Sequence, residues 1–259
     1  MKSSAISGII YHKSQMIREA FMAVITIIGR GHSGTRAISQ TLYASGVYMG
    51  NTLNPSGDKV PPDAMYDACR VMGRRVKWNG GLSWDFTPLH TMEIDSEFKD
   101  LIHAYLADVL RNKSADKGWK IPETTLVYPW IVRMFPDIKY IHWIRDPRDC
   151  ILGSHITDDL QRFGVDCPAA NDVRRRRAIS WQYQYELVKS TPKPKNYMLI
   201  RFEDFVLKHD KTIQYLEDFL GMPLAKVIVR RESVGRWKTD TGEHNFEFFR
   251  EALAAHHYD

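Results

Sequence analysis

An apolar run followed by a glycine-rich turn near residue 30 constrains this chain more than any other feature. Residues 23–29 read Ala-Val-Ile-Thr-Ile-Ile-Gly, a β-branched run ended by glycine that predicts a buried strand. Residues 30–36 read Arg-Gly-His-Ser-Gly-Thr-Arg, and residues 37–46 carry Ile38 and Leu42 at helical spacing. Loop amides, the first amides of the helix and nearby hydroxyls can all point at one anion, which the helix dipole also favours. The segment therefore predicts a phosphate cradle.

The cradle departs from the pattern of nucleotide hydrolases. Gly29 and Gly34 have the P-loop spacing G-x-x-x-x-G, but Thr35 and Arg36 stand where that loop has lysine and Ser or Thr. The lysine for the terminal phosphates and the hydroxyl for magnesium are therefore missing, and we expect no metal-assisted ATP chemistry here. A turn without a ligand is the alternative, although two glycines, two hydroxyls and two arginines exceed what a turn needs.

The length and composition fit one large α/β domain. The chain has 259 residues, of which 44% are hydrophobic, and this is ample for a packed core. We expect one domain over residues 1–259, with a partly helical lead-in over 1–21 and a helix and tail over 243–259. No apolar run approaches the length that spans a bilayer, so we expect no transmembrane segment and a cytoplasmic protein.

Cysteine usage and charge narrow the classes of ligand. Cys69, Cys150 and Cys167 are few, odd in number and not at metal-ligand spacing, so we expect reduced thiols and neither a disulfide framework nor a zinc site. The formal net charge of +5 suits an anionic ligand or partner without requiring nucleic acid.

Strands and helices alternate along the rest of the chain. Strands are predicted over 138–144 and 197–201, with 227–229 as a further candidate, and helices over 63–77, 94–111, 126–135, 169–190, 203–220 and from about 245. Residues 47–62 predict a long loop, and residues 78–88 an irregular aromatic segment. The alternation predicts an α/β fold with a central parallel sheet flanked by helices, whose ligands gather at the carboxyl ends of the strands.

The predicted strand over 138–144 leads directly into Arg145-Asp-Pro-Arg-Asp149. Asp146 is a good N-cap, Pro147 suits the first helical position and Asp149 stands where a capping-box acid would, so the motif begins a helix. A parallel sheet puts Arg145 at the same edge as the glycine-rich turn. We therefore expect one ligand with two separated anions; a capped helix start with local ion pairs is the alternative.

Five segments in this order resemble the sulfotransferase family that uses 3′-phosphoadenosine 5′-phosphosulfate, abbreviated PAPS. The segments are His32–Thr35, Trp119–Pro122, Phe135–Asp149, Arg201–Asp204 and Ser233–Lys238. They resemble the 5′-phosphosulfate loop, the Trp-Lys-x-Pro element, the strand and helix of the 3′-phosphate, the Tyr-Glu-Asp segment and the late Gly-x-Trp-Lys loop. Each is weak alone, but five at compatible spacing are strong. The turn at Gly46–Gly50 is similar to that of small bacterial members, and the resemblance implies a P-loop nucleoside-triphosphate-hydrolase-like architecture.

The resemblance also implies a donor site. The turn would hold the 5′-phosphosulfate, Arg145 the 3′-phosphate, and Phe202 would lie against adenine. The donor-binding residues that it implies are Arg30, Gly31, His32, Ser33, Gly34, Thr35, Arg36, Arg145, Ser154, Phe202, Arg230, Gly235, Arg236 and Trp237. The family's serine usually lies eight residues after the arginine, which is Gly153 here, and Ser154 would sit about 100° further round a helix.

The catalytic groups follow from the same resemblance. His32 stands where the family usually has lysine, so the cation beside the bridging oxygen is protonated His32, Lys120 or both. In-line transfer of SO3 needs prepositioned amides and cations but no metal. A hydroxyl acceptor also needs a base, and Asp58 and Asp63 follow the turn that leads to an acid in similar chains. The other candidate bases are His90, Glu93 and Glu123, and spacing does not choose among the five.

The acceptor and two rival functions remain open. The loops at 47–62 and 78–93 and the helix at 169–190 would shape a pocket for a small molecule, a carbohydrate or a lipid. Arg174–Arg177 is either solvated surface or a guide for an acidic acceptor. The rivals are a P-loop small-molecule kinase and a catalytically silent nucleotide- or polyanion-binding protein. Residues 145–149 and the missing Lys-Ser/Thr pair argue against the kinase. No pattern predicts an oligomeric state.

Overall fold

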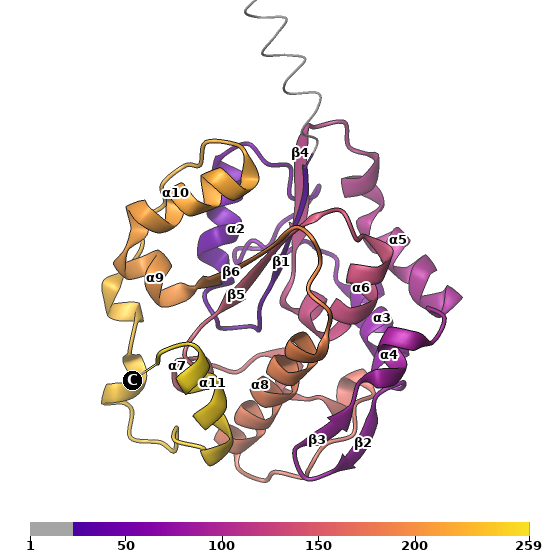
Figure 1. Ribbon diagram of the computed structural model, residues 1–259, viewed down its shortest axis with the longest axis vertical. Helices are drawn as coiled ribbons and strands as arrows, with labels where there is room; N and C mark the ends of the chain where they lie inside the picture. Colours follow the sequence, from indigo (N-terminus) through magenta and orange to yellow (C-terminus); the bar gives the residue numbers. More distant parts are fainter. Residues whose placement is uncertain (1–22, 259) are drawn as a thin grey trace, which may run out of the picture.

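The computed structural model describes residues 23–258, so the predicted lead-in over 1–21 lies outside the described residues. Four parallel strands form the central sheet in the order β4-β1-β5-β6 (Figure 1). They are β1 (Ala23–Ile28), β4 (Asp116–Lys120), β5 (Lys139–Ile144) and β6 (Tyr197–Arg201). In this register Ile27 of β1 pairs with Lys120 on one side and Ile141 on the other. The predicted α/β fold with a central parallel sheet is confirmed.

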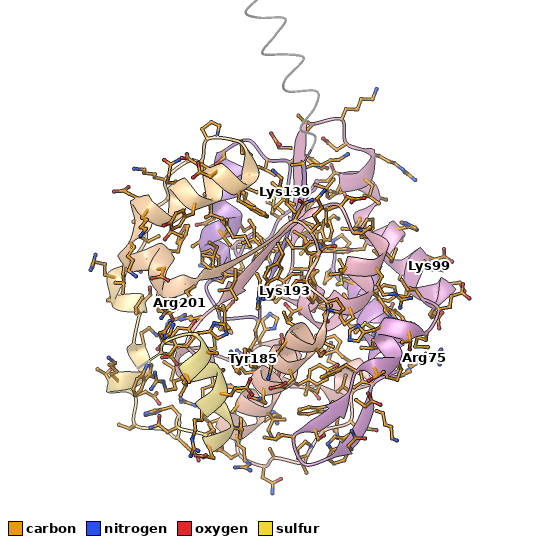
Figure 2. The ribbon with its side chains drawn as sticks, viewed as in Figure 1. Arg75, Lys99, Lys139, Tyr185, Lys193 and Arg201 are labelled. Atoms are coloured by element: carbon orange, nitrogen blue, oxygen red, sulfur yellow. The ribbon has the colours of Figure 1, made fainter. Side chains whose placement is uncertain are left out.

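Helices cover both faces of this sheet (Figure 1). One face carries α2 (Thr35–Ala44), α9 (Phe202–Leu207) and α10 (His209–Leu220), and the other α3 (Asp63–Gly73), α5 (Ser96–Arg111), α6 (Tyr128–Met134) and α8 (Val173–Ser190). Successive strand residues point to opposite faces, so Ile27 belongs to one core and Ile28 to the other. Figure 2 shows side chains filling both layers.

Smaller elements complete the chain. They are the antiparallel hairpin β2 (Lys77–Gly80) and β3 (Ser83–Asp85), α4 (Thr87–Thr91), α7 (Pro147–Cys150) and α11 (Arg250–Ala255). A third apolar cluster joins α7, α8 and α11 through Cys150, Trp181 and Ala252. None of the helices between residues 23 and 258 combines the length and the apolar character that a membrane crossing needs.

Two predicted segments differ from the structure in type, and one strand was missed. Residues 78–88 are not irregular, because they include a hairpin that turns at two glycines with positive φ, Gly80 and Gly81. Residues 227–229 form no strand, and Ile228 is 97% exposed. Strand β4 was not predicted, because Asp-Lys-Gly-Trp-Lys lacks a run of β-branched residues.

Several helix bounds also differ. The helix predicted over 169–190 begins at Val173, because the Asp172 carboxylate accepts a hydrogen bond from the Arg175 amide and caps the helix there. The helix predicted over 203–220 is interrupted at Lys208. The helix after β5 has a single turn and ends at Cys150.

Candidate functional site

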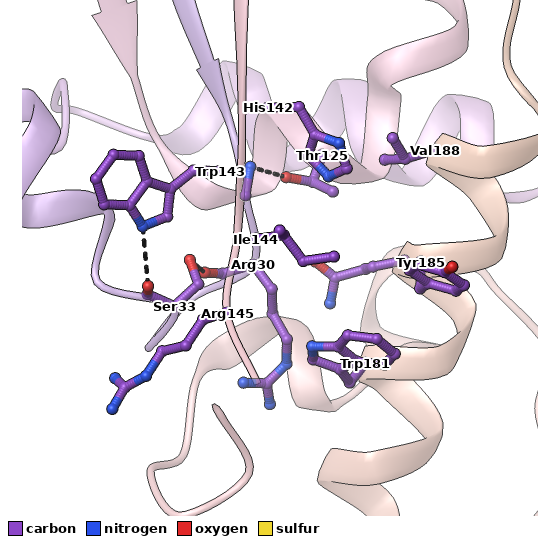
Figure 3. A pocket seen from close by; sticks show the side chains of 12 residues that line it. Arg30, Ser33, Thr125, His142, Trp143, Ile144, Arg145, Trp181, Tyr185 and Val188 are labelled. Carbon is purple, nitrogen blue, oxygen red and sulfur yellow. Dashed lines mark hydrogen bonds between the residues drawn. The ribbon is translucent and has the colours of Figure 1, made fainter. Parts of the chain in front are cut away.

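The glycine-rich turn after β1 is held in shape by hydrogen bonds from the sheet and its neighbours (Figure 3). The Gly29 amide donates to the Thr125 hydroxyl at 2.9 Å, and the Trp143 indole N–H donates to the Ser33 carbonyl at 3.0 Å. The Ser33 hydroxyl donates to the Arg30 carbonyl at 2.6 Å. Because these contacts come from the protein itself, the turn is preorganised without a ligand.

Two glycines of the turn allow close approach of other side chains. Gly34 has φ +89°, and a Cβ there would lie 2.5 Å from the Phe202 ring. A Cβ on Gly31 would lie 2.2 Å from the His155 ring. Gly34 is also the N-cap of α2 and offers no side chain to cap the helix; the Ala37 amide donates to the Gly34 carbonyl at 3.0 Å, and no side chain among the described residues caps the amides before it.

Arg145 at the end of β5 reaches the turn, as a parallel sheet requires. Its guanidinium donates to the His32 carbonyl at 3.2 Å and lies 4.4 Å from the centre of the Phe202 ring. It also pairs with Asp149 at 2.9 Å and donates to the Ser233 carbonyl. The Nε atom is buried and has no hydrogen-bond partner among the described residues. In Figure 3 the side chains of Arg30 and Arg145 extend from the strand ends in the same general direction.

A cavity of about 550 Å³, here called the cradle cavity, opens in front of the turn. Its lining includes Gly31, His32, Gly34, Thr35, Arg36, Lys120, Arg145, Phe202 and Arg230. Four of these residues carry a positive charge, and the amino end of α2 adds its dipole. The cradle cavity is therefore suited to an anion with an aromatic or apolar part.

A second cavity of about 310 Å³, here called the side cavity, adjoins the first. Asp58 and His155 line both cavities. The other residues that line the side cavity are Asn54, Val60, Pro62, Tyr66, Ile121, Glu123, Ser154 and Ile156. A ligand in the cradle cavity and a ligand in the side cavity would thus meet at Asp58 and His155.

Lys120 and Asp58 form a pair at this junction. Lys120 is the last residue of β4; its side chain is 2% exposed, pairs with the Asp58 carboxylate and donates to the Ser56 carbonyl at 2.8 Å. Burial lowers the pKa of Lys120, and Asp58 opposes the shift. Asp58 also accepts a hydrogen bond from the Asn54 side chain at 3.0 Å.

Two histidines lie close together here: His32 belongs to the turn, and His155 packs against it. His32 contacts the Ser154 carbonyl through Nε2, and its ring lies where a Cβ on Gly153 would be. Burial is the main cause that lowers the pKa of His32, so the protein alone favours a neutral imidazole. The predicted imidazolium needs the negative charge of a ligand. His155 was not predicted; its ring centre is 6.1 Å from that of His32, and burial and then Arg30 lower its pKa to about 3.

Several predicted donor-binding residues do not line the cradle cavity. The Arg30 guanidinium pairs with Asp158 and donates to the Cys150 carbonyl at 3.1 Å, so it holds the turn from behind. Ser154 lines the side cavity. Since α7 ends at Cys150, neither Gly153 nor Ser154 lies on a helix, which corrects the expected helical placement.

Asp149 was expected to close a capping box and instead holds a distant loop. Its carboxylate accepts hydrogen bonds from the amides of Gly235 and Trp237, each at 2.9 Å, and pairs with Arg145. The Trp237 ring lies 3.9 Å from the Arg148 guanidinium, and Arg236 is exposed. The loop is thereby fixed beside α7, and none of its residues 235–237 lines the cradle cavity.

The five candidate bases are separated by the structure. Asp63 is exposed at the start of α3 and lines neither cavity. Glu93 is 92% exposed and faces Lys99, while His90 lies on α4 near Arg133. Asp58 and Glu123 alone among the five line the side cavity.

The other predicted features have structural partners. Arg174 pairs with Asp240 at 3.0 Å, and Arg177 donates to the carbonyls of Ile151 and Leu152, so half of the basic run is not free surface. The three cysteines, Cys69, Cys150 and Cys167, are free thiols. Between residues 23 and 258, no group of three or more His, Cys, Asp or Glu side chains is placed to hold a metal.

Comparison with known proteins gives one family. A family model described as "Sulfotransferase family" matches residues 24–226. No curated protein matches the chain. The "Sulfotransferase Domain from the Curacin Biosynthetic Pathway" has a similar fold, with a TM-score of 0.54 and 14% identity over 92% of this chain and 98% of that one. The "Sulfotransferase Domain from the Synechococcus PCC 7002 Olefin Synthase" has a TM-score of 0.53 and 14% identity, over 92% and 95% of the two chains.

Proposed function

We propose that this chain, which belongs to the sulfotransferase family, transfers a sulfuryl group from PAPS to a hydroxyl or amine of an acceptor. The observation that carries the proposal is the contact between Arg145 and the His32 carbonyl. It brings the arginine of β5 and the glycine-rich turn of β1 to one cavity of about 550 Å³. Two anion-binding groups around one cavity are what a doubly anionic nucleotide requires.

The residues of the cradle cavity fit this donor. The buried Nε of Arg145 lacks a partner, and no side chain caps the first amides of α2. We assign the 5′-phosphosulfate to the turn at residues 31–35 and the amino end of α2, with the Thr35 hydroxyl and Arg36, and the 3′-phosphate to Arg145 and Arg230. Phe202 lies beside both Gly34 and Arg145, and we assign its ring to the adenine.

Protein groups stabilise the negative charge that develops in the transfer step. When bound, the donor supplies an activated sulfur with a phosphate leaving group. We propose that Lys120 and His32 stabilise the charge that develops on the bridging oxygen, because both line the cradle cavity. Asp58 keeps Lys120 charged and positioned against the cost of its burial. No step of this proposal uses a metal ion.

The remaining predicted residues do not contact the donor directly in this proposal. Arg30 and Ser33 shape the turn from behind. Gly235, Arg236 and Trp237 form a loop beside the 3′-phosphate position, and they contact the donor only if the loop shifts on Asp149. We propose that the acceptor is a small molecule, a carbohydrate or a lipid in a cytoplasmic setting; the predicted base Asp58 lines the side cavity.

Two measurements on the full chain test the proposal. Adenosine 3′,5′-bisphosphate at about a hundred times its Kd should raise the unfolding free energy by ~2.7 kcal/mol, and ATP with magnesium should have a smaller effect. The matched variant Arg145→Gln should lose most of this stabilisation. Equal stabilisation by ATP with magnesium would favour a kinase. Binding of the bisphosphate without any turnover of sulfate-labelled PAPS would favour a silent binding protein.

A further inference from the structure

We infer that the side cavity receives the acceptor as a small uncharged alcohol, and that Glu123 is the catalytic base that removes its proton. This inference rests on the proposed sulfuryl transfer. It names the substrate class and the proton acceptor, which the motifs of the sequence left open.

Glu123 is a buried carboxyl with one oxygen that lacks a hydrogen-bond partner. It lies in the 3₁₀ turn Pro122–Val127, which follows β4 and Lys120. The residue is 1% exposed, and its Oε1 atom has no hydrogen-bond partner among the described residues. A buried carboxyl oxygen without a hydrogen-bond partner is costly and needs an explanation beyond packing. Its place in the wall of the side cavity gives one, because a bound hydroxyl would supply the missing partner.

A single residue, His155, lies against both this carboxyl and the glycine-rich turn. His155 stands between them: its Nδ1 is 4.0 Å from Oε1 of Glu123, and its ring packs against Gly31 of the turn. The carboxyl and the cradle thus lie on either side of one imidazole ring. An alcohol in the side cavity can place its oxygen toward the cradle cavity while its proton faces Glu123.

The acidity of Glu123 suits a base near neutral pH. Burial raises the pKa of Glu123 to about 7. The backbone amide of Glu123 opposes this shift, the charge on Asp58 adds to it, and Lys120 opposes it. The titratable groups that face Glu123 from the neighbouring elements are Asp58, Tyr66, Cys69, Tyr105, Lys120 and His155. A carboxyl with a pKa near the working pH is both available as an anion and basic enough to take a proton.

The neighbouring candidates are less suited. Each carboxylate oxygen of Asp58 already accepts a hydrogen bond, Oδ1 from Lys120 and Oδ2 from the Asn54 side chain. The Nδ1 atom of His155 accepts a hydrogen bond from the Thr157 amide at 3.3 Å, and the low pKa of His155 makes it a weak base. Of the two carboxyl residues that line the side cavity, Glu123 is therefore the one with a buried oxygen that lacks a hydrogen-bond partner among the described residues.

The lining of the side cavity indicates the class of acceptor. Val60, Tyr66, Ile121 and Ile156 supply apolar surface, and the two carboxyl residues Asp58 and Glu123 supply charge. Neither Lys nor Arg belongs to the lining given by residues 23–258. Carboxylates repel an anionic acceptor, and apolar walls favour a hydrocarbon body. A volume of about 310 Å³ admits a small molecule or the end of a larger one.

The step balances without a further reactant. The alcohol oxygen forms a bond to sulfur as its proton passes to a carboxylate oxygen of Glu123. The bond between sulfur and the 5′-phosphate oxygen breaks, and its electron pair leaves with adenosine 3′,5′-bisphosphate. Glu123 then returns the proton to solvent.

The activity test uses sulfate-labelled PAPS and two probe acceptors, benzyl alcohol and 4-(hydroxymethyl)benzoate. The wild type should transfer label to benzyl alcohol with at least a tenfold higher kcat/KM than to the benzoate. Glu123→Gln should lose at least ~100-fold in kcat with benzyl alcohol. Glu123→Ala should lose as much and recover at least tenfold on addition of formate, which a purely structural role does not predict. Glu186→Gln is the matched control, because Glu186 on α8 also has a pKa raised by burial but lines neither cavity.

Separate readouts distinguish failure of this inference from failure of the proposed function. Infrared difference spectra of wild type against Glu123→Gln should give a Glu123 pKa of about 7 without any acceptor. A pKa near 4.5, full turnover by Glu123→Gln, or no rescue by formate would overturn its role as base. Lack of transfer to benzyl alcohol, or preference for the benzoate, would overturn the acceptor class. Lack of binding of adenosine 3′,5′-bisphosphate would instead overturn the proposed function.

Discussion

The contact between α7 and the loop at 233–237 gives a prediction whose size follows from the structure. The Asp149 side chain is fully buried and accepts three hydrogen bonds at 2.9 Å, from Arg145, Gly235 and Trp237. Asp149→Asn removes the charge and leaves one acceptor oxygen for three donors. Bonds to a charged group contribute ~1.5–3 kcal/mol each, and breaking a buried pair costs ~3–5 kcal/mol. We expect the unfolding free energy to fall by ~3 kcal/mol.

Urea unfolding followed by circular dichroism measures this loss, and the melting temperature should fall by ~6–12 °C in a chain of this size. Amide exchange at Gly235 and Trp237 should accelerate at the same time, because both amides lose their acceptor. Asp204→Asn is the control, since Asp204 forms a surface pair with Lys208 and should change the free energy by less than ~1 kcal/mol. A loss below ~1 kcal/mol in Asp149→Asn with unchanged exchange would refute the role given to Asp149.

Three further predictions concern the site. Lys120→Met should lower turnover of PAPS by ~100-fold in single-turnover assays while adenosine 3′,5′-bisphosphate still binds within about threefold, because the charge on Lys120 acts on the leaving group; unchanged turnover would remove it from the mechanism. Gly31→Ala should abolish binding of the bisphosphate in calorimetry, because its Cβ would meet the His155 ring at 2.2 Å; full binding would show that the turn shifts freely. Between about pH 4.5 and 7 the wild type should lose ~3 kcal/mol of unfolding free energy relative to Glu123→Gln, because the folded carboxyl keeps a proton that the unfolded chain has released; parallel pH profiles in urea unfolding would contradict the raised pKa.

Contiguous sequence predicted the parts of the fold that depend on local pattern. The strand and turn around Gly29 and the strand that ends at Arg145 are each read from one stretch, and a parallel sheet brings their ends together. The predicted acidic cap of α7 has the same local origin, and Asp146 does accept the Arg148 amide. Local pattern failed at β4, whose residues pair with β1 although they lack β-branched side chains.

The candidate site required contacts that sequence spacing does not encode. Whether Asp58 or Glu123 is free depends on where Lys120 points, which is set by the packing of β4 against the loop at 47–62. The place of His155 beside Gly31 follows from an irregular segment after α7, and no residue pattern marks it. The hydrogen bonds from the loop at 235–237 to Asp149, more than 80 residues away in sequence, could not be predicted from spacing either.

The central claim is that one bisphosphorylated adenosine joins the end of β1 to the end of β5. A crystal structure of the full chain with adenosine 3′,5′-bisphosphate tests it most directly. The account predicts the 5′-phosphate on the turn at residues 31–35, the 3′-phosphate on Arg145, and open space between the 5′-phosphate and the side cavity. A nucleotide bound elsewhere, or with neither phosphate on Arg145, would contradict the account.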